Sequence, residues 1–243
     1  MLRNGESQKA NQLLNQVFKN ESKEILKPIV KPMNEISKQE LWKCFTQTFY
    51  EMNGKAFQQD QDAIKNLKVL FFYFLQDEKF FECENLRADI TIPSFKKGLL
   101  IIGGFGLGKS NYFKVFEKVF RRFASLRFKF YTTNELVQKY ESCQKPLDKD
   151  YFFKEVKRKR MFIDEINSER LASNYGHFDV VEEVLISRYD NKLITFASCN
   201  YNSYDACAKQ TLEDLGLRYG SRIYDRFHEI FNIIEFTGLS YRR

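Results

Sequence analysis

The chain has 243 residues, 43% of them hydrophobic and 29% charged, which indicates a soluble globular protein of one large domain or of a core with a small appendage. Its net charge of +7 and its pI near 9.0 favour a polyanionic partner only mildly. The five cysteines are odd in number and form no C-x-x-C pair, the N-terminus is polar, and the most apolar run spans only 69–75. The sequence therefore speaks against a disulfide framework, a zinc site, a signal peptide and a membrane span, and predicts a cytoplasmic protein with reduced thiols.

The N-terminal segment 1–35 is polar and lysine-rich, and we expect it to be a tail. One short amphipathic helix is predicted over 7–20, where Leu13, Leu14, Val17 and Phe18 recur at helical spacing. Pro28 and Pro32 prevent a helix from continuing, because proline lacks a backbone donor and restricts the residue before it. Two interpretations of the tail remain open, plain disorder and a helix that docks onto a partner.

Residues 36–95 are predicted to form a small helical N-terminal subdomain. A first helix over 37–52 opens with the capping-box pattern S-x-x-E at Ser37 and carries apolar residues on one face. A second, longer helix over 59–80 is rich in aromatic residues, and 83–95 is a connector with strand character. We expect this subdomain to lead directly into the central motif of the chain.

A glycine-rich stretch at 103–110 fits the phosphate-binding P-loop pattern G-x-x-x-x-G-K-[ST]. It follows an apolar, β-prone segment at 98–102 and precedes 111–123, where apolar residues recur at helical spacing. The motif therefore lies between a buried strand and a helix N-terminus, whose partial positive charge attracts anions. The alternative, a glycine-rich turn that binds nothing, does not require this strand–helix context.

The residue types of the P-loop indicate a nucleotide site with a divalent cation. Glycines let the backbone curl so that its N–H groups point at phosphate oxygens. Lys109 would reach the β- and γ-phosphates and the Ser110 hydroxyl would ligate Mg²⁺, so ATP and Mg²⁺ are the expected cofactors. The predicted nucleotide-binding residues are Gly103, Gly104, Phe105, Gly106, Leu107, Gly108, Lys109, Ser110 and Asn111.

A strand and two helices are predicted between the P-loop helix and the next motif. Residues 127–131 alternate between polar and apolar as a strand does, and 134–141 is a predicted helix. A loop is expected at 146–147, before a short helix over 150–157 that ends in the basic run 157–160.

The second motif, at 161–165, consists of three apolar residues followed by Asp164 and Glu165. Apolar residues followed by two acids at the end of a strand match a Walker B motif. Asp164 would hold Mg²⁺ through water, and Glu165 would polarise the attacking water as a general base. The alternative is a strand that ends in a polar turn, and the position downstream of a P-loop favours the functional interpretation.

The next strand is predicted at 193–197, after an apolar helix over 178–189, and it leads to Asn200. An amide beside the Walker B strand is placed to orient the lytic water or to contact the γ-phosphate. The alternative is an ordinary turn residue, because asparagine is common in turns. The context favours the role of a sensor.

Two helices and a strand complete the chain. The helices are predicted over 212–217 and 221–230, and the second carries Arg222 and Arg226 four residues apart on one face. The last strand is predicted at 231–236, and the sequence ends seven residues later.

Taken together, the P-loop, the Asp164–Glu165 pair, Asn200 at a strand end and Arg226 before the last strand resemble an AAA+ ATPase. The resemblance assigns 96–243 to an AAA+ ATPase domain. It implies an α/β P-loop core whose five parallel strands follow the order 5-1-4-3-2. It also implies ATP hydrolysis as the activity.

A closer resemblance is to DnaC/DnaI-type helicase loaders and to IstB-type transposition helpers. Residues 219–227 are similar to the segment that ends in an arginine finger in those families, and 186–190 also resembles theirs. Members of these families lack or shorten the C-terminal helical lid, and the resemblance implies that no such lid follows the last strand here. The resemblance implies that Arg226 or Arg222 completes the ATP site of a neighbouring subunit, so that the protein self-associates through its ATP sites.

The function implied by this resemblance is a DNA replication protein that binds single-stranded DNA and loads a hexameric replicative helicase. Its ATPase activity would be stimulated by DNA and by assembly. Three alternatives remain open: an IstB-like helper of a transposase, a weakly hydrolysing nucleotide-gated interaction module, and a small-molecule P-loop kinase. The candidate phosphate-tracking residues are Arg121, Arg122, Arg127, Lys157, Arg158, Lys159 and Arg160, which otherwise form a solvated charged face.

Overall fold

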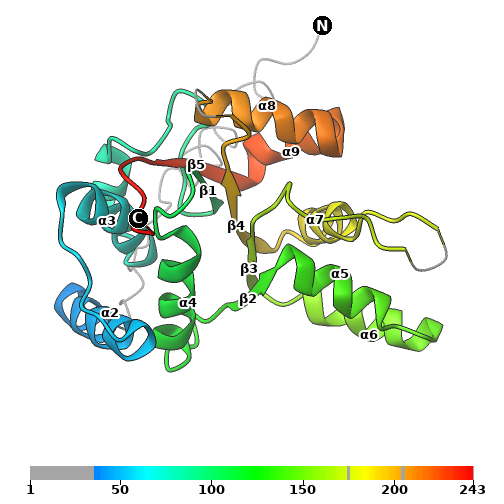
Figure 1. Ribbon diagram of the computed structural model, residues 1–243, viewed down its shortest axis with the longest axis horizontal. Helices are drawn as coiled ribbons and strands as arrows, with labels where there is room; N and C mark the ends of the chain where they lie inside the picture. The colour runs from blue at the N-terminus through cyan, green and yellow to red at the C-terminus, as the bar shows by residue number, and fades with distance from the viewer. Residues whose placement is uncertain (1–35, 174–175, 204–205, 243) are drawn as a thin grey trace, which may run out of the picture. The chain divides into compact units, whose positions relative to one another are not determined.

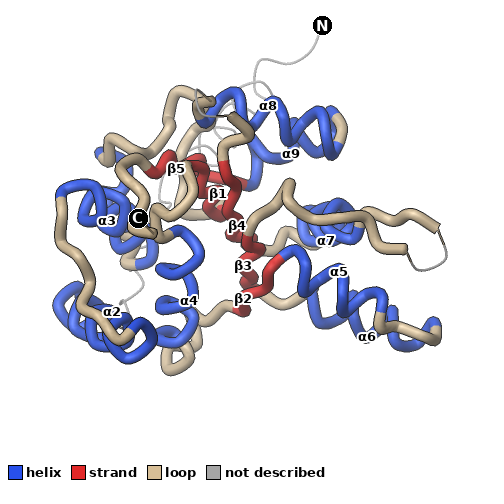
Figure 2. The backbone as a smooth tube through the Cα atoms, in the orientation of Figure 1, coloured by secondary structure: helices blue, strands red, loops and turns tan. Residues whose placement is uncertain are grey.

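The computed structural model describes residues 36–173, 176–203 and 206–242. The tail 1–35, with the helix predicted over 7–20, lies outside these ranges. A five-stranded parallel sheet runs through the described part, with helices on both sides (Figure 1, Figure 2). The strands are β1 (Gly98–Gly103), β2 (Lys129–Thr132), β3 (Arg160–Asp164), β4 (Ile194–Asn200) and β5 (Phe231–Phe236). Their order is β2-β3-β4-β1-β5, which confirms the predicted order 5-1-4-3-2.

The sheet is covered on both faces, and the central strand β1 is therefore a continuous apolar run whose six residues are all buried. Successive residues of a strand point to opposite faces. In β1, Leu99 and Ile101 contact one helical layer, and Leu100 and Ile102 contact the other. The first layer contains α2 (Lys38–Asn53), α3 (Gln61–Phe74) and α4 (Lys109–Phe120). The second contains α5 (Thr133–Glu141), α6 (Pro146–Val156), α7 (Val180–Asp190), α8 (Ala208–Tyr219) and α9 (Ser221–Ile230).

Phenylalanine side chains join the N-terminal helices to the P-loop helix and to the sheet. The rings of Phe45 on α2 and Phe74 on α3 each lie 4.9 Å from that of Phe116 on α4, measured between centroids. Phe113 stacks on Phe162 of β3 at 4.0 Å. The helices of the predicted N-terminal subdomain therefore share one hydrophobic core with α4 and the sheet.

Helix boundaries depart from the prediction at several places; α8, for example, starts at Ala208 rather than at residue 212. The helix expected over 59–80 ends at Phe74, because Gln76 takes a left-handed backbone conformation (φ 51°). Asp77 then caps a separate 3₁₀ turn, Glu78–Glu82. At 146–147 a loop was expected, but Pro146 starts α6, since proline is well tolerated at the first helical position.

The strand character expected at 83–95 is confined to a single antiparallel bridge between Leu86 and Ile234. Two backbone hydrogen bonds flank it, from Arg87 to Ile233 and from Glu235 to Asn85. The segment therefore covers the free edge of β5 without becoming a sixth strand, which protects that edge from pairing with another chain. Within the ranges that the structure describes, no helix is long and apolar enough to cross a membrane.

Candidate nucleotide-binding site

The P-loop joins β1 to α4 and depends on two glycines with positive φ. Gly106 (φ 80°) and Gly108 (φ 86°) adopt the left-handed conformation that glycine accepts most readily. A Cβ atom at Gly108 would lie 2.7 Å from the Tyr112 ring, so glycine is also required there for space. No side chain caps α4 at Gly108, which leaves the first N–H groups of this helix for an anion.

Lys109 and Asn200, predicted from separate motifs, are in direct contact. The Lys109 ammonium donates hydrogen bonds to the Gly103 and Gly104 carbonyls at 2.7 Å and to Asn200 Oδ1 at 2.8 Å. The contact follows from the topology, because β1 and β4 are neighbours with Gly103 opposite Asn200. Burial lowers the pKa of Lys109 to about 8. A cation and an amide acceptor therefore meet at the carboxyl end of the sheet.

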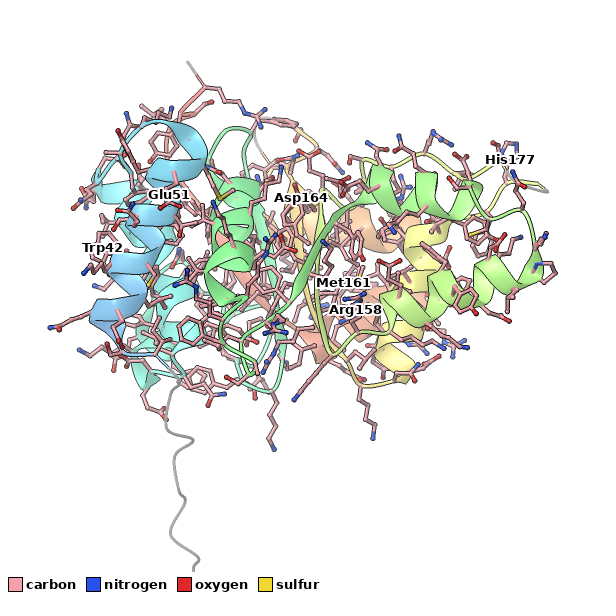
Figure 3. The ribbon with its side chains drawn as sticks, turned by 90° about the horizontal axis from the view of Figure 1, so that it is seen from below. Trp42, Glu51, Arg158, Met161, Asp164 and His177 are labelled. Atoms are coloured by element: carbon pink, nitrogen blue, oxygen red, sulfur yellow. The ribbon has the colours of Figure 1, made fainter. Side chains whose placement is uncertain are left out.

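Asp164, at the end of β3, receives two hydroxyl groups. Ser110 Oγ donates to its Oδ1 at 2.9 Å, and Ser198 Oγ donates to the same atom at 2.6 Å. Figure 3 shows Asp164 near the central strands, whereas Trp42 lies on the outer α2. Burial raises the pKa of Asp164, and these two hydrogen bonds act in the opposite direction. The predicted metal ligands Ser110 and Asp164 are thus adjacent.

The donor set of this pair fits Mg²⁺, which is usually held by one or two carboxylates together with phosphates and water. Ser110 and Asp164 supply a hydroxyl and a carboxylate oxygen, both hard ligands. In the described ranges no cluster of three or more His, Cys, Asp or Glu side chains could hold a metal alone. A magnesium ion here would therefore need the phosphates of a nucleotide as further ligands.

Ser198 is a site residue that sequence reasoning missed. Its Oγ donates to Asp164 and accepts the Glu165 backbone N–H at 3.0 Å, so one buried hydroxyl orients both Walker B acids. The available signal was its position two residues before Asn200. β3 and β4 are parallel neighbours with Ile163 opposite Ala197, which places Ser198 beside Asp164.

Glu165 has a positive φ of 60°, which is uncommon for a residue other than glycine. Its carbonyl accepts a hydrogen bond from the Ser168 hydroxyl at 2.6 Å, and its N–H is held by Ser198. Such strained conformations persist where the surroundings over-determine them, and they cluster at functional sites. Here the strain turns the Glu165 side chain toward the cavity described next.

A cavity of about 320 Å³ opens beside these groups. Nine predicted residues line it: Phe105, Gly106, Leu107, Gly108, Lys109, Ser110, Asn111, Glu165 and Asn200. The aromatic side chains in its lining are Phe49, Phe57, Phe105, Tyr112 and Tyr241. A lining that combines apolar rings with a lysine and with acidic and amide groups suits a nucleotide, which has an aromatic base and charged phosphates.

The segment after β5 returns to the P-loop and was not anticipated from the sequence. Asn66 of α3 is fully buried and donates to the Thr237 carbonyl at 2.8 Å. Tyr241 donates its N–H to the Gly106 carbonyl at 3.1 Å and its hydroxyl to Asp60 at 2.9 Å. The chain end accordingly lies beside α3 and α4 in Figure 1. This path brings Arg242 into the cavity lining, where its charge contributes to lowering the pKa of Lys109.

The two candidate finger arginines lie outside the cavity. Arg226 is 9% exposed, its guanidinium lies 3.3 Å from Asp190 Oδ1, and it covers the Tyr189 ring at 4.2 Å from the centroid. Arg222 is exposed and has no ion pair with any other described residue. α9 leads into the first residue of β5, whereas the P-loop follows the last residue of β1. The structure thus brings together the P-loop, Walker B and sensor residues, but not the arginines.

The seven basic residues predicted to track phosphates lie at the opposite edge of the sheet, near the amino ends of the strands. Arg121 and Arg122 follow α4, Arg127 precedes β2, and the run 157–160 leads into β3. All are exposed except Arg160, which is partly buried. Arg158 is labelled in Figure 3. The basic edge and the nucleotide cavity are therefore distinct surfaces.

A P-loop after β1, an acid pair after β3, an asparagine ending β4 and the order 5-1-4-3-2 define an AAA+ type of P-loop fold. Among solved structures, the chain is similar to the DnaC helicase loader, with 19% identity, a TM-score of 0.52, and coverage of 78% of this chain and 98% of that one. It is also similar to DnaI, with 20% identity, a TM-score of 0.48, and coverage of 74% and 88%.

A putative primosome component from Streptococcus pyogenes serotype M3 has 18% identity, a TM-score of 0.45, and coverage of 76% of this chain and 100% of that one. No protein-family model and no curated protein sequence matches the chain. At these identities the likeness to DnaC establishes the fold. It confirms the expectation that the chain has the architecture of the DnaC/DnaI-type group.

Proposed function

We propose that this protein is an AAA+ ATPase of DNA replication that binds single-stranded DNA and loads a replicative helicase. The observation that carries the ATPase assignment is the convergence of Lys109, Asn200, Ser110 and Asp164 through hydrogen bonds of 2.7 to 2.9 Å. Residues from three separate strand ends meet as a nucleotide site requires. The loading role is supported by the likeness of the fold to a helicase loader.

ATP would bind with its phosphates at the start of α4 and its base between the α2–α3 loop and α4. Phe57 and Tyr112 supply apolar surface at that end of the cavity. Asn53 lies there too, with its Oδ1 accepting from Asn111 at 3.0 Å. Lys109 would exchange its bonds to the Gly103 and Gly104 carbonyls for phosphate oxygens, which are stronger acceptors.

Hydrolysis needs a metal, a base and a group that holds the water. Ser110 and Asp164 would hold Mg²⁺, which would supply charge neutralisation on the phosphates. Glu165 lines the cavity and would take a proton from the attacking water, while Asn200 orients that water or the γ-phosphate. Ser198 keeps Asp164 and Glu165 in these positions.

An arginine from a neighbouring protomer would complete the site. Neither Arg222 nor Arg226 is among the residues that line the cavity of their own protomer, which supports action on a neighbour. Such a finger neutralises charge on the γ-phosphate and is worth a large factor in turnover. Self-association through the ATP sites, around single-stranded DNA and against a hexameric helicase, follows from this arrangement.

The test compares ATP turnover of the wild-type protein alone, with single-stranded DNA, with duplex DNA and with a hexameric replicative helicase. Lys109→Ala is the control for nucleotide binding and Glu165→Gln the control for chemistry, with an expected loss of turnover of roughly 10²-fold or more. Stimulation by single strands and by the helicase supports the proposal. ATP binding without turnover under all four conditions indicates a nucleotide-gated interaction module. Stimulation by duplex DNA, but not by single strands or by the helicase, instead indicates an IstB-like helper.

A further inference from the structure

A buried polar cluster lies directly behind the Walker B acids, and the cavity lining does not include it. Tyr219, the last residue of α8, is 3% exposed. Its hydroxyl accepts the Asn167 N–H at 3.1 Å and donates to Glu169 Oε1 at 2.5 Å. The Glu169 carboxylate is itself fully buried, and Arg218 lies 2.7 Å from it. One phenol thus holds the backbone and a side chain of the loop that follows Asp164 and Glu165.

The loop held by Tyr219 is conformationally strained. Asn167 has a φ of 76°, two residues after Glu165 with its φ of 60°. Two left-handed residues so close together are costly unless their contacts compensate. The Tyr219 hydroxyl supplies one of those contacts, and its removal leaves the partly buried Asn167 N–H without this acceptor.

A second route joins the sensor strand to the same helix. The Asn167 side chain donates to Asn202 Oδ1 at 3.2 Å, and Asn202 donates to Asp214 of α8 at 2.8 Å. Asn202 follows Asn200 by two residues. Both groups expected to meet the γ-phosphate, Glu165 and Asn200, are therefore within two residues of a hydrogen bond that leads to α8.

The ring of Tyr219 faces in the other direction, toward α9. Its centroid lies 6.4 Å from that of Phe227, in an edge-on arrangement. Phe227 is fully buried and directly follows Arg226 in the sequence. Only Gly220 separates α8 from α9, so a movement of Tyr219 is passed to the helix that carries both candidate finger arginines.

We propose that Tyr219 is a positioning residue that sets the Walker B loop for hydrolysis and couples that loop to the arginine-bearing helix α9. Its hydroxyl fixes 167–169, and through them the backbone of Glu165, while its ring transmits the state of the loop to Phe227. This inference rests on the proposed ATPase function. It adds a connection from the site of one protomer to the residues that this protomer offers to its neighbour.

The experiment uses Tyr219→Phe, which keeps the ring and removes only the hydroxyl, in the full chain. The matched control is Tyr224→Phe on α9, because the Tyr224 ring packs against His228 and its hydroxyl has no hydrogen bond within the described ranges. The measurements are ATP affinity, kcat and KM for ATP with single-stranded DNA present, and hydrogen exchange of 221–230 with and without ATP. Glu169→Gln is a second variant, since it keeps the shape and an acceptor but removes the charge.

For Tyr219→Phe we expect kcat to fall about tenfold while ATP affinity stays within about twofold, as for the loss of a residue that orients a site from behind. A general loss of stability would not separate kcat from affinity in this way. ATP is also expected to change exchange in 221–230 in the wild type and in Tyr224→Phe, but not in Tyr219→Phe. Glu169→Gln should act in the same direction with a smaller effect.

Unchanged kcat in Tyr219→Phe, beside a wild type that hydrolyses ATP, overturns this inference and leaves the proposed function standing. A wild type without turnover under any condition overturns the proposed function. In that case hydrogen exchange is the only measurement that tests the coupling between the Walker B loop and α9. A response of 221–230 in the wild type that is absent in Tyr219→Phe supports the coupling. Equal responses in the two proteins, including none in either, overturn it. Should Tyr219→Phe fail to fold, Glu169→Gln takes its place in each comparison.

Discussion

The hydroxyl of Ser110 lies 2.9 Å from the carboxylate of Asp164, to which it donates a hydrogen bond. The two residues are 54 positions apart in the sequence, one at the start of α4 and the other at the end of β3. β1 and β3 are not neighbours in the sheet, because β4 lies between them. The carboxyl ends of these strands nevertheless place the two predicted magnesium ligands within contact of each other.

This contact predicts the magnesium dependence of the protein. Ser110→Ala removes a hard oxygen ligand and Asp164→Asn replaces a charged carboxylate with a neutral amide, so we expect the Mg²⁺ concentration for half-maximal turnover to rise at least about tenfold. Titration of turnover with Mg²⁺ at saturating ATP measures the shift. Ser142→Ala is the control, because within the described ranges the Ser142 hydroxyl bonds only to the Gln138 carbonyl of its own helix. A shift in the control as large as in Ser110→Ala would contradict the assignment.

The lowered pKa of Lys109 predicts how ATP affinity depends on pH. Burial holds this pKa at about 8, below the usual 10.5, and of the charges nearby Asp164 and Glu165 favour the ammonium while Arg242 opposes it. Phosphates bind the ammonium form of Lys109. Above pH 8 this side chain is mostly neutral in the free protein, so ATP binding requires the uptake of a proton by Lys109. We therefore expect the affinity for ATP to fall about tenfold between pH 7 and pH 9.

Isothermal titration of ATP across this pH range measures the dependence. Lys114→Gln is the control, because Lys114 lines the same cavity but lies over the Phe130 ring rather than among the carbonyls. The control should keep the profile of the wild type. A wild-type affinity that does not change up to pH 9 would contradict the role of Lys109 as a titrating phosphate ligand in this range.

We expect substitution of Arg188 to lower the stability of the protein strongly, although Arg188 does not line the nucleotide cavity. Its side chain is fully buried and donates to the Val156, Arg158 and Ile194 carbonyls and to the Thr195 hydroxyl, at 2.6 to 2.9 Å. Arg188→Met would leave several buried acceptors unpaired, so the free energy of unfolding should fall by about 3 kcal/mol or more. Urea unfolding measures it, with the exposed Arg158→Met as control. Equal midpoints for the two variants would contradict the prediction.

The motifs were predictable because each has its chemistry in contiguous residues. The P-loop shows its glycines and Lys109 in eight positions, and Asp164 with Glu165 directly ends an apolar run. Ser198 could not be predicted, since its role depends on the lateral pairing of β3 with β4. The position of Arg242 in the cavity lining could not be predicted either. It depends on the return of the chain along the P-loop, which is held by Asn66 and which no local sequence pattern indicates.

The sequence resemblance and the structure give different information about the finger residues. The resemblance leaves Arg222 and Arg226 open as candidates, and the structure shows Arg226 buried against Asp190 and Tyr189, with Arg222 exposed. An arginine that acts on a neighbour must be free at the surface of its own protomer. If Arg226 is the finger, assembly has to break its contact with Asp190, and Asp190→Asn should then increase ATP-dependent self-association.

The test of the finger mixes two inactive variants. Lys109→Ala lacks a working P-loop but keeps both arginines, and Arg226→Ala or Arg222→Ala keeps the P-loop but lacks one arginine. A finger cannot act in its own site, so a mixed interface can pair the intact P-loop of one variant with the intact arginine of the other.

We expect each arginine variant to bind ATP normally, and we expect turnover to reappear on mixing for the variant that lacks the finger. If Arg226 is the finger, Arg226→Ala loses turnover and regains it on mixing. Arg222→Ala then still has its finger, so it keeps its turnover before mixing and shows no recovery. If both arginine variants are folded and associate with Lys109→Ala but neither regains turnover, the site is not shared between subunits and the loader mechanism proposed for this chain is wrong.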